Sequence, residues 1–229
     1  MEPNVSVEEV SKFDALADEW WNPKGPMRPL HAMNPARIGF VNARIAPGSR
    51  ILDAGCGAGL AAEALARAGH SVLGIDQAES VLKVAEAHAA GAGLNLSYRR
   101  VRAEELALET ERFEVITALE IIEHIPDPSA LLQNLAGLLV PGGKLFVSTL
   151  NRNKRSWLMA KLGAEYLLRM LPVGTHDWQK FITPAEMAAM GRDAGLRLTD
   201  SAGLSFDPLR GDWKLSRDLG VNYLVEFVG

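Results

Sequence analysis

Short apolar runs alternate with helical patterns through the middle of the chain. The apolar runs predict strands at residues 50–53, 71–75, 96–100, 114–117 and 144–148. Between them, the spacing of apolar positions predicts helices at residues 59–68, 78–90 and 128–139. Strands that alternate with helices in this way indicate βαβ units and a parallel sheet.

The C-terminal part of the chain extends this pattern. The sequence Pro141-Gly142-Gly143 predicts a turn into the fifth strand, and Thr183 and Pro184 stand where a helix N-cap and first turn are expected. Strands at residues 197–204 and 222–228 then form a final hairpin. The prediction is an α/β fold with a doubly wound, seven-stranded, mostly parallel sheet.

We expect one domain made of four consecutive parts. Residues 1–49 carry two tryptophans and several prolines before the first strand and predict an N-terminal helical lid, with a helix at 36–45. Residues 50–150 form the core, residues 151–180 a helical insertion after the fifth strand, and residues 181–229 a C-terminal helix with the strand hairpin.

Composition and charge exclude several classes of protein. The 229 residues are 48% hydrophobic and 23% charged, which suits a globular chain with a sizeable core. A net charge of −4 and a pI near 5.8 argue against a nucleic-acid binder. The single cysteine, Cys56, excludes an internal disulfide, and neither a signal-peptide core nor a transmembrane run is present. We therefore expect a cytoplasmic protein.

The first strand runs into a glycine-rich turn with the sequence DAGCGAG, residues 53–59. Gly55 and Gly57 can adopt backbone angles closed to other residues, and they put no side chain between the loop and a bound molecule. A dinucleotide-binding turn reads G-x-G-x-x-G, whereas here Leu60 stands where its third glycine belongs. This spacing disfavours a pyrophosphate.

Two aspartates accompany the turn. Asp53 lies at its mouth, where a negative charge would repel a phosphate but suit an amine or a sulfonium. Asp76 ends the second strand about twenty residues later, where an acid can accept hydrogen bonds from ribose hydroxyls. The pattern resembles the first motif of the S-adenosylmethionine-dependent methyltransferases. The alternatives are a nicotinamide cofactor or a turn with no ligand.

A second group of polar residues follows the fourth strand. Glu120, Glu123 and His124 stand at i, i+3 and i+4, positions that share one face in a helical turn. The first and fourth strands flank the switch in strand order, so this group should face the glycine turn. Two carboxylates and an imidazole there suit a divalent metal, Mg²⁺ first, with Mn²⁺, Zn²⁺ or Co²⁺ as alternatives.

Three interpretations of this group remain open. A metal that grips two phenolic oxygens would lower their pKa, which is otherwise near 10, and so prepare them for methylation. Without a metal, His124 could accept the proton as a general base. The group could also only satisfy backbone groups around Pro126.

Three further residues are candidates for cofactor contacts. Arg37, in the helix before the first strand, could reach a cofactor carboxylate through its guanidinium, or simply lie in solvent. Leu119 and the backbone at Glu104 follow the fourth and third strands, where an adenine edge would lie. Leu119 is equally consistent with core packing.

The insertion contains a basic amphipathic stretch at residues 154–171. Its apolar side chains include tryptophan and tyrosine, and its charged residues are Lys154, Arg155, Lys161, Glu165 and Arg169. The stretch is too short and too charged to span a bilayer. It predicts contact with an anionic membrane surface, the wall of an apolar substrate tunnel, or a helix packed in the core.

Taken together, these segments resemble the ubiquinone-biosynthesis O-methyltransferases over nearly the whole chain. The specific segments are Asn34-Pro35-Ala36-Arg37, Glu120-x-x-Glu123-His124, Thr149-Leu150-Asn151-Arg152-Asn153 and Gly174-Thr175-His176-Asp177. Ala58 and Leu119 depart mildly from the family's pattern, where glycine and methionine are common.

The resemblance implies a Rossmann-like class I methyltransferase that methylates a polyprenylated catechol. It implies that Arg37, Gly55, Asp76 and Leu119 contact S-adenosyl-L-methionine and that Glu120, Glu123 and His124 bind the metal and act in catalysis. It also implies peripheral attachment to the inner membrane face and leaves room for other quinone-biosynthesis proteins as partners. The alternatives are a methyltransferase for another small molecule or a protein, an NAD-dependent oxidoreductase, and a scaffold without a cofactor.

Overall fold

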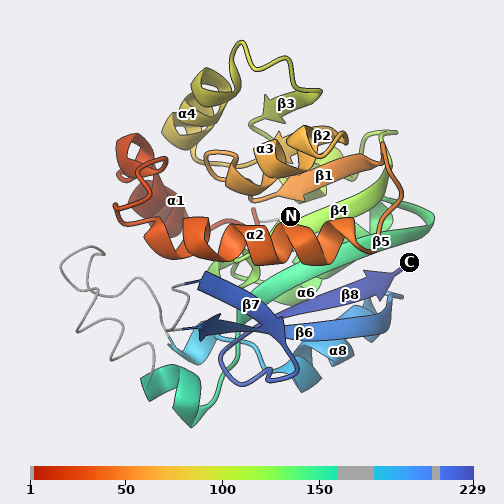
Figure 1. Ribbon diagram of the computed structural model, residues 1–229. Coiled ribbons are helices and arrows are strands. Elements are labelled where there is room, and N and C mark those ends of the chain that lie inside the picture. Colours follow the sequence, from red (N-terminus) through yellow and green to blue (C-terminus); the bar gives the residue numbers. More distant parts are fainter. Residues whose placement is uncertain (1–2, 159–177, 208–211) are drawn as a thin grey trace.

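The computed structural model describes residues 3–158, 178–207 and 212–229. Its strands are β1 (Arg50–Ala54), β2 (Ser71–Ile75), β3 (Leu96–Arg99), β4 (Phe113–Leu119), β5 (Leu139–Leu150), β6 (Arg197–Asp207), β7 (Asp212–Ser216) and β8 (Asn222–Val228). Within the described residues they form one eight-stranded sheet in the order β3-β2-β1-β4-β5-β8-β6-β7. Figure 1 shows this sheet running through the molecule.

The first five strands are parallel, as predicted. Strand β1 pairs with β2 on one side and with β4 on the other, and β4 pairs in parallel with β5. The carboxyl ends of β1 and β4 therefore lie side by side where the strand order reverses, which is where ligands bind in sheets of this type. Strand β8 enters antiparallel between β5 and β6. The doubly wound α/β fold is confirmed.

Helices cover both faces of the sheet. They are α1 (Val7–Asp14), α2 (Arg28–Asn42), α3 (Leu60–Arg67), α4 (Glu79–Ala89), α5 (Ala103–Leu106), α6 (Pro128–Gly137) and α8 (Pro184–Asp193), with short 3₁₀ turns η1 (Ala17–Glu19), η2 (Ile122–His124) and η3 (Trp178–Lys180). In Figure 1, α2 lies across one face and α6 and α8 lie behind the other.

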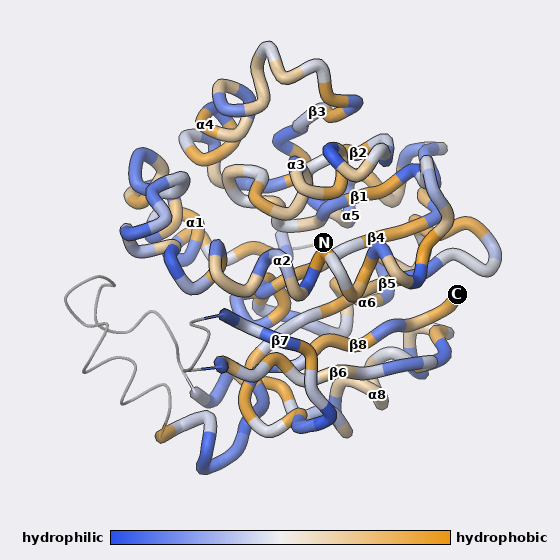
Figure 2. Tube along the Cα trace, viewed as in Figure 1, coloured by the Kyte–Doolittle hydropathy of each residue, from blue (hydrophilic) through white to orange (hydrophobic). Residues whose placement is uncertain are grey.

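Alternate residues of each strand face opposite layers. In β1, Ile51 packs in a cluster with Phe40 of α2, whereas Leu52 packs in a second cluster with Leu132 of α6. Figure 2 shows hydrophobic residues concentrated along the central strands. The sheet thus divides the core into two layers, one packed on each face of β1.

Three details differ from the sequence prediction. Within the described residues, the predicted pair of terminal strands forms as β6 and β8, but the sheet has one more strand than the seven expected, because the short and largely polar β7 pairs with the other edge of β6. The predicted turn at residues 141–143 lies inside β5, where Gly142 adopts a φ of 75° and the pairing with β4 is irregular. Helix α2 begins at Arg28, earlier than expected, and contains Pro35.

Most of the predicted amphipathic stretch lies outside the described residues. Residues 154–158 are helical, and Trp157 and Leu158 are each about half exposed. The Gly174-Thr175-His176-Asp177 segment also lies outside them. In the part of the chain that is described, no helix has the length and apolar character needed to cross a membrane.

Candidate active site

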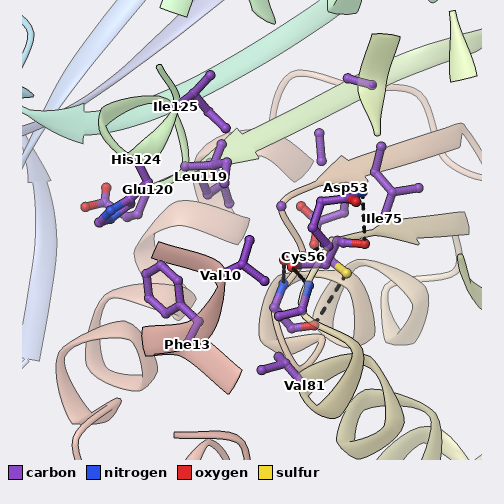
Figure 3. Close-up of a pocket in the computed structure, with 18 of the residues that line it drawn as sticks. Val10, Phe13, Asp53, Cys56, Ile75, Val81, Leu119, Glu120, His124 and Ile125 are labelled. Carbon is purple, nitrogen blue, oxygen red and sulfur yellow. Dashed lines mark hydrogen bonds between the residues drawn. The ribbon is translucent and has the colours of Figure 1, made fainter. Parts of the chain in front are cut away.

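A cavity opens at the carboxyl ends of β1 and β4, between the sheet and the N-terminal helices. Among the residues that line it are nine of those selected from the sequence: Arg37, Asp53, Gly55, Gly57, Asp76, Glu104, Leu119, Glu120 and His124. Figure 3 shows Asp53 and Cys56 on one side of this cavity and Glu120 and His124 on the other, with Val10 and Phe13 from α1 beside it. Glu123 is not part of the wall.

The glycine turn is shaped as the sequence predicted. Gly55 and Gly57 adopt φ values of 70° and 52°, which side chains rarely allow. A Cβ added at Gly57 would lie 2.3 Å from Cζ2 of Trp20, and one at Gly55 would lie 2.6 Å from Cγ1 of Ile121. Because the turn has no side chains at these positions, Trp20 and Ile121 can pack closely against it and its backbone borders the cavity.

Asp76 anchors the other edge of the turn. Its Oδ2 accepts a hydrogen bond of 2.9 Å from the backbone N–H of Gly57, and its Oδ1 accepts from Gln77 and Ala78. Burial raises the pKa of Asp76, although these three backbone donors oppose the shift. The carboxylate is thus fixed in orientation at the cavity wall, where a diol could share its oxygens.

Asp53 lies buried at the base of the cavity. Its Oδ1 accepts a 2.7 Å hydrogen bond from Oγ1 of Thr117, but its Oδ2 is buried without a hydrogen-bond partner. Burial raises the pKa of Asp53 to about 7, and the charge of Asp76 adds to the shift. An unsatisfied buried acceptor of this kind is suited to a donor or a cation from a ligand.

Glu120, Glu123 and His124 do not share one helical face. Glu120 adopts a left-handed φ of 56°, and helical geometry begins only after it, in η2. The break at Glu120 is the physical reason that the expected i, i+3, i+4 face does not form. Each of the three side chains consequently points to a different partner.

Glu120 is held by the pre-strand helix. Its Oε1 lies 2.8 Å from Nη2 of Arg37 and accepts hydrogen bonds from Ser148 and Asn222. Arg37 therefore lies at the cavity, as predicted, but its guanidinium faces a carboxylate of the protein. The sequence predicted either an exposed Arg37 or an Arg37 that contacts a cofactor carboxylate. It did not predict the ion pair with Glu120.

Glu123 is turned toward the core. Its Oε2 accepts a 3.0 Å hydrogen bond from Oγ1 of Thr149, and its Oε1 is buried with no hydrogen-bond partner. Burial, reinforced by the charge of Glu120, raises the pKa of Glu123 to about 8. Among the described residues no three histidine, cysteine, aspartate or glutamate side chains are grouped to hold a metal ion.

His124 faces the N-terminal helix α1. Its Nδ1 lies 2.8 Å from Oε2 of Glu9, and the ring of Phe13 meets the imidazole edge-on, with centroids 5.1 Å apart. The side chains of Glu9 and His124 are both buried. Burial lowers the pKa of His124 and outweighs the opposing effect of Glu9. A lowered pKa keeps the imidazole neutral near pH 7.

Comparison with known proteins agrees with this geometry. Residues 29–201 match the family model of a methyltransferase domain. The ubiquinone biosynthesis O-methyltransferase of Coxiella burnetii is 46% identical over 227 residues, covering 99% of this chain and 97% of the relative. The enzyme of the same name from Aeromonas salmonicida is 45% identical and covers 98% and 96%.

The chain belongs to the ubiquinone biosynthesis O-methyltransferase family. Solved structures agree in fold. A SAM-dependent methyltransferase from Thermotoga maritima superposes with a TM-score of 0.69 at 16% identity, covering 95% of this chain and 98% of that one. Magnesium protoporphyrin IX methyltransferase from Synechocystis, solved with bound SAH, gives a TM-score of 0.63 at 20% identity, covering 86% and 82%. The chain therefore has the fold of the SAM-dependent methyltransferases.

The N-terminal segment, residues 3–27, forms part of the cavity wall. Trp21 donates a 2.9 Å hydrogen bond to the carbonyl of Ala58 in the glycine turn. Asn4 exchanges two 2.8 Å hydrogen bonds with the backbone of Asp127, and its N–H donates to the side chain of Glu104. The segment that the sequence predicts to be a lid thus contacts both sides of the site, and its role as a lid stays a prediction.

Sequence reasoning missed Glu9. The only signal was the spacing of Ser6 and Glu9, which marks a helix start, and Oγ of Ser6 does accept from the backbone N–H of Glu9. Nothing in that spacing reveals a contact with His124, because the two residues are 115 positions apart.

Proposed function

We propose that this protein transfers a methyl group from S-adenosyl-L-methionine to a phenolic hydroxyl of a polyprenylated catechol, an intermediate of ubiquinone biosynthesis. The proposal rests on one cavity that has different functional groups on its two sides. The glycine turn and Asp76 lie on one side and a buried neutral imidazole on the other. The names of the relatives supply the substrate class.

The residues of the first side fit the cofactor. The unpaired Oδ2 of Asp53 suits an ammonium group, the glycine turn leaves backbone exposed, and the fixed carboxylate of Asp76 suits a ribose diol. Leu119 would give apolar contact and the backbone at Glu104 hydrogen bonds to the adenine. When bound, S-adenosylmethionine supplies an electrophilic methyl group on a sulfonium.

His124 would remove the proton from the acceptor. A phenol with a pKa near 10 is a poor nucleophile at neutral pH, so a base that takes its proton during the reaction lowers the barrier. Burial keeps the pKa of His124 below its ordinary value, which leaves the imidazole unprotonated and ready to accept. Arg37 and Glu120 form the adjacent wall and would orient the acceptor ring.

The rest of the wall suits an apolar substrate. Val10 and Phe13 of α1 and Ile121, Ile125 and Leu131 near α6 line the cavity beside His124. Burying apolar area contributes roughly 25 cal/mol per Å², so a prenyl tail against these side chains would bind favourably. Because the lid closes over them, the reaction is shielded from water.

A divalent cation is the alternative means of activating the hydroxyl. The buried, unpaired Oε1 of Glu123 and the nearby Glu120 are oxygen donors of the kind Mg²⁺ prefers. In the arrangement observed, however, Glu120, Glu123 and His124 face Arg37, Thr149 and Glu9, and they do not fit a metal ion. No step of the proposed reaction therefore passes through a metal.

We also propose that the protein works in the cytoplasm, at the inner membrane surface. Support comes from the half-exposed Trp157 and Leu158 next to Arg155, whose side chain is 62% exposed. Aromatic and basic side chains together suit an anionic lipid surface. Flotation with anionic liposomes should recover the wild type, while a protein with Trp157 and Leu158 changed to serine should stay in solution. Equal recovery of the two would contradict this contact.

The proposed reaction is tested with cofactor carrying a deuterated methyl group and a short-chain prenylated catechol. Mass spectrometry should find the label on one ring oxygen of the product. Label on a soluble catechol but not on the prenylated one would favour a small-molecule methyltransferase. Binding of NAD in place of S-adenosylhomocysteine, measured by calorimetry, would favour the oxidoreductase alternative.

A further inference from the structure

Two aromatic side chains of the N-terminal segment line the cavity. They are Phe13 of α1 and Trp20, which follows η1. Trp20 is buried, and its ring centroid lies 6.0 Å from that of Phe13, with the two ring planes tilted by 55°. Aromatic rings interact over this separation. We call the pair the aromatic wall.

Trp20 lies against the part of the glycine turn that links the two aspartates. The backbone N–H of Gly57 donates a 2.9 Å hydrogen bond to Oδ2 of Asp76, and Asp53 lies four residues earlier in the chain. A Cβ added at Gly57 would lie 2.3 Å from Cζ2 and 3.0 Å from Cη2 of Trp20. The six-membered ring of Trp20 therefore packs against the backbone between the carboxylate proposed for the ammonium group and the one proposed for the ribose.

The chemistry of the cofactor places its sulfonium in the same region. In S-adenosylmethionine the sulfur joins the ribose to the chain that bears the ammonium group, so it lies between the groups assigned to Asp76 and Asp53. A sulfonium has no hydrogen to donate in a hydrogen bond. Aromatic rings attract cations through the negative charge at their faces, and tryptophan does so most strongly. A tryptophan in the cavity wall beside the turn thus suits this cation.

Phe13 extends the aromatic wall toward the acceptor side. Its ring meets the imidazole of His124 edge-on, with centroids 5.1 Å apart, and Figure 3 shows both residues on the side of the cavity away from Cys56. In the proposed reaction the acceptor oxygen forms a bond to the methyl carbon, and the electron pair of the broken S–C bond stays with the sulfur. The sulfur is then neutral, so its attraction to the rings falls once the methyl group has left.

We propose that the aromatic wall recognises the positive charge of the sulfonium, with Trp20 as the main determinant, and so distinguishes S-adenosylmethionine from its product S-adenosylhomocysteine. The proposal rests on the cofactor site proposed above. The carboxylates of Asp53 and Asp76, which also line the cavity, are a second source of attraction for a cation. The experiments therefore compare changes to the rings with a change to a carboxylate.

Calorimetry with the two ligands tests the proposal without turnover. Trp20→Leu should raise the ratio of the Kd for S-adenosylmethionine to the Kd for S-adenosylhomocysteine by about threefold or more, because the cation loses its aromatic partner. Trp20→Phe should raise the ratio less. The matched control is Trp21→Leu, because Trp21 donates to the carbonyl of Ala58 in the turn but is not among the described residues that line the cavity. This control should weaken both ligands by the same factor. An unchanged ratio in Trp20→Leu would overturn the proposal.

Fluorinated tryptophan gives a test that nearly preserves the shape of the ring. Fluorine withdraws electron density from the ring face and so weakens its attraction to a cation. Full-length protein in which all five tryptophans are replaced by fluorinated tryptophan should show a raised ratio of the two Kd values. The same labelling of Trp20→Phe should leave the ratio of that variant unchanged. An equal rise in both proteins would assign the effect to another tryptophan and contradict the role of Trp20.

A carboxylate variant separates this proposal from the function on which it rests. Asp53→Asn should weaken both ligands by a similar factor, since both carry the ammonium group. A raised ratio in Asp53→Asn but not in Trp20→Leu would assign recognition of the sulfonium to the carboxylate and overturn the role of the aromatic wall. If the wild type binds neither ligand, the proposed cofactor site is wrong, and the role of the aromatic wall is wrong with it.

Discussion

Nη2 of Arg37 lies 2.8 Å from Oε1 of Glu120, and this ion pair joins α2 to the end of β4 at the cavity wall. The two side chains are only 4% and 14% exposed. Because Ser148 and Asn222 also donate to Glu120, the carboxylate is paired on several sides. The pair thus fixes the residue at which the strand turns into the active-site loop.

Replacing Arg37 by methionine should destabilise the fold. Glu120, whose side chain is 14% exposed, would lose its cation, and removing one partner of a buried pair costs up to about 3–5 kcal/mol. The free energy of unfolding in guanidinium chloride measures this loss. Lys83→Ala, which breaks a solvent-exposed pair with Glu79, is the control and should change little. If the free energy of unfolding falls by the same small amount in both variants, the Arg37–Glu120 pair does not have the structural role described.

Gly57→Ala should disturb the contact between the glycine turn and the lid. A left-handed φ costs an alanine about 1–2 kcal/mol, and the new Cβ would also collide with Trp20. Gly48 has a similar φ of 73° and open space around it, so Gly48→Ala should cost only the conformational part. Chemical denaturation of both variants gives the difference. Equal losses would show that Trp20 does not rest on the turn.

Asp53→Asn should change how stability depends on pH. Burial raises the pKa of Asp53 from an ordinary 3.8 to about 7, so the folded protein holds this proton more tightly than the unfolded chain. Its contribution to stability is complete below about pH 4 and is lost as the pH rises through 7. Asparagine does not titrate. The variant should therefore gain stability relative to the wild type between pH 4 and 8, as measured by urea unfolding. A constant difference across that range would contradict the raised pKa.

Removal of divalent metal should leave methyl transfer largely intact. The side chains of Glu120, Glu123 and His124 are directed to separate partners, and the base in the proposed reaction is an imidazole. Activity after chelation and gel filtration should remain within about twofold of the untreated enzyme, by the general-base argument. Complete loss, restored by added Mg²⁺, would instead favour a metal and a rearrangement of these three side chains.

Local signals explain how much of the fold the sequence predicted. Strand β2 has the predicted bounds, and the helix at Thr183 begins with the expected cap, because hydrophobic alternation and capping residues act over a few positions. Strand β7 was missed since its residues are mostly exposed and only pairing with β6 makes it a strand. Helix α2 was shortened in the prediction because Pro35 usually ends a helix.

The candidate site likewise combines features that the sequence predicted with features that it did not. The positions of Gly57 and Asp76 follow from the strand–turn–helix pattern, and the hydrogen bond between them joins residues in neighbouring βα units. The contacts of Glu9 and Arg37 depend on how helices pack over the sheet, which no short motif encodes. The left-handed φ of Glu120 likewise depends on its surroundings, and it separated residues that a regular helical turn would have grouped.

In the proposed reaction, one cavity binds the cofactor at the glycine turn and His124 removes the proton of the acceptor. The most direct measurement is a pair of titrations with S-adenosylhomocysteine and single-turnover assays on Asp76→Asn and His124→Ala. Asp76→Asn should lose cofactor binding, while His124→Ala should bind within about twofold of the wild type and lose turnover by at least about a hundredfold. If His124→Ala loses binding and turnover to the same extent, the turn after β4 is structural and the account is wrong.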